Sequence, residues 1–171
     1  FFLKKIKKFN KEIFVDGDKS LSIRWALLAS LAIGKSRAYN LLKSEDVLST
    51  LKSLKKLGVK IRFTKKFHEI YGNGLDGYKF KENLIIDAGN SGTLGRLIPA
   101  LLVQSPKKIK LIGDKSLSKR DFSRVIDPLT KFGVTFYPKN KKTLPLIIKG
   151  TNFIRPKKYF EDKGSAQCKS S

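Results

Sequence analysis

The sequence has very few of the residues that form disulfides and metal sites. It contains one cysteine, Cys168, one histidine, His68, and no methionine. A single cysteine cannot form a disulfide within the chain, and one cysteine with one histidine is too little for a common zinc site. Such cysteine usage is typical of a reducing compartment, so we expect a cytoplasmic protein without a bound metal.

Long apolar runs are lacking as well. No apolar stretch approaches the roughly 20 residues that a membrane-spanning helix needs, and the lysine-rich beginning has no uninterrupted apolar core of the kind found in secretory signals. We therefore expect no membrane partner. Because the chain opens on Phe1 and contains no methionine, we also expect it to begin and end inside a longer protein.

Acidic residues are scarce, with 14 against 37 basic residues and a net charge of +23. This imbalance predicts an anionic partner, either nucleic acid or a phosphorylated metabolite. The lysines are scattered over expected turns and outer helix faces, with no arginine-rich recognition helix and no aromatic ribonucleoprotein pattern, which favours a generally solvated surface. A basic nucleic-acid-binding module remains the alternative hypothesis from composition.

The apolar pattern predicts two similar runs of strands and helices, and 171 residues at 40% hydrophobic content allow a sizeable core. The first run has an expected strand, a helix starting at Asp18 or Ser20 and stopping at Gly34, and then further elements at 37–42, 44–58, 59–63 and 67–71. The second has elements at 84–86, 93–103, 108–112, 120–132, 134–137 and 144–148. The expected first strand covers 3–15. The fold class predicted is α/β (α+β), built from repeated β-α-β-α-β-β units.

Three serines stand at expected helix starts. Ser20, Ser91 and Ser165 follow one another at intervals of 71 and 74 residues. The first turn of a helix presents free backbone N–H groups that bind anions. The spacing therefore predicts one structural unit used three times, with each copy directed at a shared anionic ligand.

Two of these helix starts carry further candidate binding residues. Lys19 and Arg24 flank Ser20, so that an ammonium and a guanidinium can address one small anion; the alternative is a helix cap with surface charges. In the run 87–93, glycines on both sides of Asn90 and Ser91 allow the backbone to approach a phosphate closely; the alternative is a purely structural turn. Arg120 follows another charged connection, and its local sequence fits a phosphate contact or a surface position equally.

Five runs in order along the chain resemble the enolpyruvyl transferase family. They are Asp18-Lys-Ser-Leu-Ser-Ile-Arg24, Leu42-Lys-Ser-Glu-Asp-Val47, Gly89-Asn-Ser-Gly-Thr-Leu-Gly-Arg96, Gly113-Asp-Lys-Ser-Leu-Ser-Lys-Arg120 and Ser165-Ala-Gln-Cys-Lys-Ser170. The resemblance is to the branch that uses shikimate 3-phosphate. The sister branch, which uses UDP-N-acetylglucosamine for cell-wall precursors, usually has Lys-Asn in place of Lys19-Ser20 and is the second alternative.

The resemblance implies a transferase of aromatic amino acid and chorismate biosynthesis. It would move the enolpyruvyl group of phosphoenolpyruvate onto the 5-hydroxyl of shikimate 3-phosphate through a tetrahedral intermediate, with no cofactor and no metal. The residues implied to bind shikimate 3-phosphate are Lys19, Ser20, Arg24, Ser165, Ala166 and Gln167. Those implied to bind phosphoenolpyruvate are Lys19, Asn90, Gly92, Arg120 and Gln167. Asp121 departs from the family, which commonly has proline after this arginine.

The resemblance also implies a division of the chain. Residues 1–14 would be a leading strand of another domain, and 15–171 an incomplete substrate-binding domain of the kind called an inside-out α/β barrel. Its first unit would cover about 15–80, its second about 82–150, and a third would open at about 158–171. The general acid and base residues would belong to a missing C-terminal half, so we expect this chain to be inactive alone.

Overall fold

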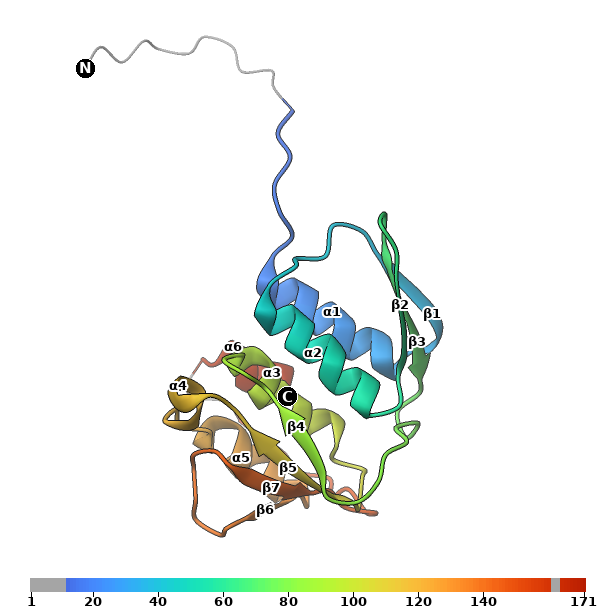
Figure 1. The fold of residues 1–171 in the computed structure, drawn as a ribbon. Coiled ribbons are helices and arrows are strands. Elements are labelled where there is room, and N and C mark those ends of the chain that lie inside the picture. Colours follow the sequence, from blue (N-terminus) through green and yellow to red (C-terminus); the bar gives the residue numbers. More distant parts are fainter. Residues whose placement is uncertain (1–11, 161–163) are drawn as a thin grey trace, which may run out of the picture.

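The computed structural model describes residues 12–160 and 164–171 (Figure 1). In the first half, α1 (Lys19–Leu31) and α2 (Glu45–Lys56) pack side by side against a sheet. Its strands are β1 (Ile33–Ala38), β2 (Lys60–Phe63) and β3 (His68–Asn73), in the antiparallel order β1-β3-β2. The apolar side of α2 faces inward, with Val47, Leu51 and Leu54 all buried.

The second half repeats the layering with a four-stranded sheet. Its strands are β4 (Leu84–Asp87), β5 (Lys108–Ile112), β6 (Thr135–Tyr137) and β7 (Leu146–Lys149), in the order β4-β5-β7-β6. Strands β4 and β5 are parallel, as a strand-helix-strand connection requires, and the other pairs are antiparallel. The helices are α3 (Gly92–Leu101), α4 (Lys115–Ser118), α5 (Ser123–Lys131) and α6 (Ala166–Ser170).

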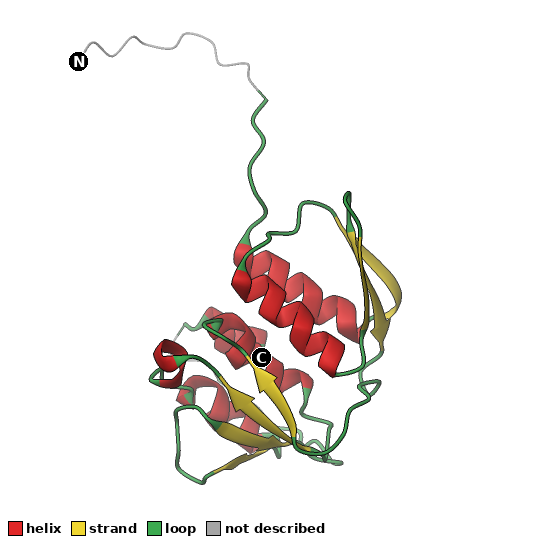
Figure 2. Cartoon of the chain, viewed as in Figure 1, coloured by secondary structure: helices red, strands yellow, loops and turns green. Residues whose placement is uncertain are grey.

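The helices of the two halves pack against each other. Both α1 and α2 contact α3, which in turn contacts α5 and α6 (Figure 2). The first sheet lies against α1 and α2, and the second contacts α5 through β6 and also α2 through β4. Buried residues of both halves form one continuous hydrophobic core. This packing fixes the starts of α1, α3 and α6 relative to one another, which is what the candidate site depends on.

Side-chain caps define these helix starts. Asp18, Ser91 and Ser165 are the N-caps of α1, α3 and α6, and each side-chain oxygen accepts the backbone N–H three residues later. The expectation of a helix start at each of the three places is therefore confirmed. Ser20 itself is not a cap, because Asp18 takes that role and leaves the Ser20 hydroxyl in the first helical turn.

Other boundaries differ from expectation. Helix α1 ends at Leu31 and Gly34 lies inside β1 with a φ of 95°, so this glycine serves a strand and not the helix end. The strand expected at 37–42 is in fact β1, which begins at Ile33. Of the strand expected at 3–15, residues 12–15 form neither strand nor helix, and the rest lies outside the described residues. Over the described part of the chain, no helix has the length and apolarity needed to cross a bilayer.

The helix expected at 120–132 is shorter than predicted. Helix α5 begins at Ser123, whose backbone N–H is accepted by the Asp121 carboxylate, so Arg120 lies in the connection from α4. Because α5 begins only after Arg120, the guanidinium of Arg120 can turn toward the start of α3, where it contacts Asn90.

Candidate anion-binding cleft

An open cleft of about 890 Å³ lies where α1, α3, α5 and α6 meet. Five of the predicted binding residues line it: Ser20, Arg24, Ser165, Ala166 and Gln167. Thr93 of α3 and Arg124 of α5 complete its polar wall. The structure thus brings together side chains that are up to 147 positions apart in the printed sequence.

Arg24 is the cation that α1 contributes to this cleft. It lies one turn after Ser20, so both side chains lie on the same side of the helix. Its Nε and Nη2 atoms each lie 3.3 Å from the Ser170 Oγ of α6. Within the described ranges, no carboxylate lies within ion-pairing distance of Arg24.

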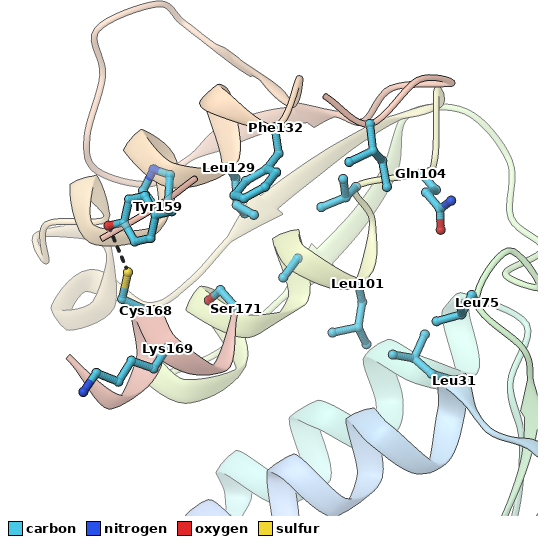
Figure 3. A pocket seen from close by; sticks show the side chains of 14 residues that line it. Leu31, Leu75, Leu101, Gln104, Leu129, Phe132, Tyr159, Cys168, Lys169 and Ser171 are labelled. Carbon is cyan, nitrogen blue, oxygen red and sulfur yellow. Dashed lines mark hydrogen bonds between the residues drawn. The ribbon is translucent and has the colours of Figure 1, made fainter. Parts of the chain in front are cut away.

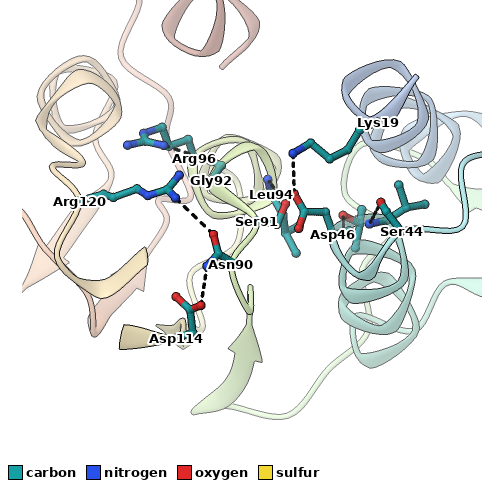
Figure 4. A network of polar contacts seen from close by, with 12 residues as sticks. Lys19, Ser44, Asp46, Asn90, Ser91, Gly92, Leu94, Arg96, Asp114 and Arg120 are labelled. Atoms are coloured by element: carbon teal, nitrogen blue, oxygen red, sulfur yellow. Dashed lines mark hydrogen bonds and ion pairs between the residues drawn. The ribbon is translucent and has the colours of Figure 1, made fainter. Parts of the chain in front are cut away.

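Lys19 lies beside the cleft and not among its lining residues. Its Nζ atom is 3.2 Å from Asp46 Oδ2 at the start of α2 (Figure 4). Asp46 is an acidic residue in the first turn of α2, where it complements the helix dipole. Its second role, holding the Lys19 ammonium, depends on how α1 and α2 pack and has no local sequence signal.

A second polar cluster surrounds the start of α3 (Figure 4). The Asn90 amide donates to Asp114 Oδ2 at 2.6 Å, while Asn90 Oδ1 accepts from Arg120 Nη2 at 3.2 Å. The backbone N–H of Leu117, and then the Asn90 amide, hold the pKa of Asp114 below its ordinary value. A charged Asp114 therefore orients Asn90, and Asn90 in turn orients Arg120.

Gly92 lies directly beneath two guanidinium groups. A Cβ atom at this position would be 2.9 Å from Arg96 Nη1 and 3.2 Å from Arg120 Nη1. Arg96 Nη2 also donates to the Asp121 carbonyl at 3.0 Å, and its guanidinium stacks 5.0 Å from the centre of the Phe122 ring. Only a residue without a side chain allows both arginines to approach the backbone here.

Sequence reasoning missed Arg96, although it ends the run 89–96. Burial, followed by the charges of Arg120 and Arg124, lowers the pKa of Arg96, which still stays protonated in water at neutral pH. None of these three arginines lies within 4.0 Å of a carboxylate oxygen in the part of the chain that the structure describes. Such a cluster is suited to bind anions, because Asp114 and Asp121 lie near it but hold none of its guanidinium groups in an ion pair.

The cleft and the second polar cluster adjoin along α3. Thr93 lines the cleft, while its neighbour Gly92 lies under Arg96 and Arg120. Asp121 is not paired with Arg120, because its carboxylate accepts from Ser123 and its carbonyl accepts from Arg96. Its charge does act on Arg96, but burial and the neighbouring arginines outweigh it in setting the pKa of that residue. The arrangement can hold two anions side by side.

A different cavity, of about 520 Å³, is largely apolar (Figure 3). Its walls include Leu31, Leu101, Leu129 and Phe132. At one end, the Tyr159 hydroxyl lies 3.5 Å from Cys168 Sγ, a contact that Figure 3 marks with a dashed line. None of the residues predicted to bind a ligand lines this cavity. Its chemistry does not fit a charged substrate.

Comparison with known proteins places the chain among longer relatives. The family described as EPSP synthase (3-phosphoshikimate 1-carboxyvinyltransferase) matches residues 3–171. Enzymes named 3-phosphoshikimate 1-carboxyvinyltransferase are 41% identical over 158 residues in Streptococcus mutans serotype c and 44% identical over 170 residues in Ruthia magnifica. These matches cover 92% and 99% of this chain but 37% and 39% of the relatives.

A solved structure shows the same likeness in three dimensions. The EPSP synthase of Acinetobacter baumannii superposes with a TM-score of 0.84 at 34% identity, covering 92% of this chain and 36% of the solved chain. The fold class inferred from the sequence is thereby confirmed. The matches favour neither the nucleic-acid-binding module nor the sister branch.

Proposed function

Since the chain belongs to the EPSP synthase family, we propose that it forms the shikimate-3-phosphate side of a transferase of aromatic amino acid and chorismate biosynthesis. The enzyme moves the enolpyruvyl group of phosphoenolpyruvate to the 5-hydroxyl of shikimate 3-phosphate. The observation that carries the proposal is the single cleft that collects Ser20, Arg24 and the 165–167 segment from opposite ends of the chain.

Shikimate 3-phosphate carries a carboxylate and a phosphate at separate positions, and the cleft offers matching donors. Arg24 provides a planar guanidinium suited to bidentate contact with a carboxylate. The Ser20 hydroxyl, the Ser165 hydroxyl and the Gln167 amide add neutral donors, and Ala166 lines the wall between them. Lys19 lies close by, and leaving Asp46 would bring its ammonium to the ligand.

Phosphoenolpyruvate would occupy the adjoining cluster, held by Asn90, Gly92 and Arg120, with Gln167 and Lys19 between the two substrates. The two substrates repel each other, and fixed guanidinium groups offset that repulsion. In the reaction the 5-hydroxyl gives up its proton as its oxygen bonds to C2 of phosphoenolpyruvate, and C3 takes up a proton as the C2–C3 double bond opens, giving a tetrahedral intermediate. Loss of phosphate from C2 and of a proton from C3 then restores the double bond in the enolpyruvyl group.

We also propose the division of the chain into residues 1–14, from another domain, and units at about 15–80, 82–150 and 158–171 of one substrate-binding domain. General acid and base residues, and further phosphoenolpyruvate-binding cations, would come from the part of the enzyme beyond the matched region. The 171-residue chain should then bind shikimate 3-phosphate without turning it over. From the single cysteine, we place the enzyme in the cytoplasm.

Calorimetric titration with shikimate 3-phosphate, inorganic phosphate and UDP-N-acetylglucosamine tests the proposal. Selective binding of shikimate 3-phosphate that is lost in Arg24→Ala supports it. Arg62→Ala is the matched control, because it removes the same charge from β2, outside the cleft. Equal binding of every anion by both variants, falling steeply with salt, would reduce the cleft to part of a basic surface, and preference for the nucleotide sugar would favour the sister branch.

A further inference from the structure

Ser170 makes an unusual set of contacts for a serine near the end of a short helix. Both Nε and Nη2 of Arg24 point at its Oγ atom, each at 3.3 Å. The same hydroxyl lies 2.6 Å from the carbonyl oxygen of Ala166, to which it donates its one proton. A hydroxyl has one donor and two acceptor positions, so these three contacts use its full capacity.

The consequence for Arg24 is a fixed orientation. A guanidinium has five N–H donors, and Ser170 takes one from Nε and one from Nη2. The three that remain include the edge formed by Nη1 and Nη2, which is the edge suited to bidentate contact with a carboxylate or phosphate. Arg24 and Ser170 both line the cleft, and the contact with Ser170 leaves this edge unused for a ligand that enters there.

We propose that Ser170 is a positioning residue, which holds the Arg24 guanidinium in its binding orientation and links it to the first turn of α6. This inference rests on the proposed function for its ligand. Through Ala166, the same hydroxyl joins two of the segments proposed to bind shikimate 3-phosphate. Arg24 would otherwise have to be ordered at the moment of binding, since no carboxylate in the described ranges holds it.

The contact between the Arg24 guanidinium and the Ser170 hydroxyl is tested first without any ligand. In a ¹⁵N-labelled 171-residue chain, the Arg24 Nε–H resonance, assigned by its loss in Arg24→Lys, should exchange slowly with water. Ser170→Ala should speed this exchange roughly tenfold, as expected for loss of one hydrogen bond to a charged group, whereas Ser170→Thr should restore it. Ser171→Ala is the matched control, because its hydroxyl also bonds to the carbonyl four residues earlier but does not touch the Arg24 side chain.

Binding measurements then test whether this contact raises the affinity for shikimate 3-phosphate. Titration with shikimate 3-phosphate should show an affinity about tenfold lower in Ser170→Ala than in the parent chain or Ser170→Thr, and no further loss when Ser170→Ala is added to Arg24→Ala. An Arg24 resonance or an affinity that is unchanged in Ser170→Ala would overturn the inference. Slow Arg24 exchange in a parent chain that does not bind shikimate 3-phosphate would support the positioning contact and count against the proposed function instead.

Discussion

Replacing Gly92 with alanine should separate folding from anion binding. The added Cβ would lie 2.9 Å from Arg96 Nη1 and 3.2 Å from Arg120 Nη1, so the first guanidinium must retreat by about 0.5 Å to reach an ordinary contact distance. Both obstacles are the far ends of flexible side chains, and Gly92 has no positive φ. We therefore expect the free energy of unfolding to change by less than about 0.5 kcal/mol.

The binding of phosphoenolpyruvate should respond much more strongly. Displacing two arginines weakens charge-assisted hydrogen bonds, and partial loss of one such bond costs about 1–2 kcal/mol, or about 5- to 30-fold in affinity. Calorimetry with phosphoenolpyruvate at saturating shikimate 3-phosphate measures the affinity, and urea unfolding measures the free energy of unfolding. The affinity for shikimate 3-phosphate alone serves as the internal control and should not change. Unchanged phosphoenolpyruvate affinity in a folded Gly92→Ala chain would refute the assignment of phosphoenolpyruvate to the polar cluster at the start of α3.

Three further predictions concern single groups. Asp46→Asn should change the free energy of unfolding by less than about 1 kcal/mol, because the Lys19 side chain is 51% exposed; a larger loss in urea unfolding would contradict this. The hydrogen bond from Arg37 lowers the pKa of Glu69, so this carboxylate stabilises the fold above its ordinary pKa and the stabilisation is lost as the pH falls through the lowered value. Glu69→Gln should therefore flatten the acid side of the unfolding profile, and an unaltered profile would refute that cause. Burial raises the pKa of Tyr78 to about 12, so its contribution to stability should be complete below its ordinary pKa and decline as the pH rises toward the raised value. Because the chain has five tyrosines, the ultraviolet titration is compared with that of Tyr78→Phe, and loss of a phenol that ionises in the ordinary range would contradict this.

Local chemistry made much of the fold predictable. Helix α2 lies within the expected element at 44–58: Ser44 is its N-cap, and the chain leaves it through Gly58 at a φ of 85°. The expected strand at 108–112 matches β5. These features depend on residues close in sequence: a side chain that caps its own helix, a glycine that adopts a left-handed conformation, and an alternating apolar pattern.

Errors arose where a local signal had two meanings. The pattern predicts a helix stop at Gly34, yet the positive φ of this glycine serves β1, which pairs with Asn73 and Gly72 of β3 from its first residues. The pattern also predicts Arg120 inside a helix, but the Asp121 carboxylate accepts from Ser123 and α5 begins after Arg120. In both cases a tertiary or capping contact decided between alternatives that the sequence pattern alone left equal.

The candidate site shows the same limit. Sequence could nominate Arg24 from its place beside a helix start, but not its partner Ser170, which lies 146 residues away. An arginine inside a helix carries no sequence signal for a site, whereas here Arg96 lies against the Gly92 carbonyl and the Phe122 ring. Such roles depend on the packing of α3 against α5 and α6, which no short motif encodes.

The central claim is that one cleft, and not the basic surface in general, recognises shikimate 3-phosphate. Its most direct test is to map backbone amide shifts in the ¹⁵N-labelled chain as this ligand is added. We predict saturable shifts concentrated at the cleft residues Ser20, Thr93 and 164–170, with little change on the outer strand β2. Shifts spread over the lysine-rich surface, or centred on the apolar cavity beside Phe132, would contradict the account.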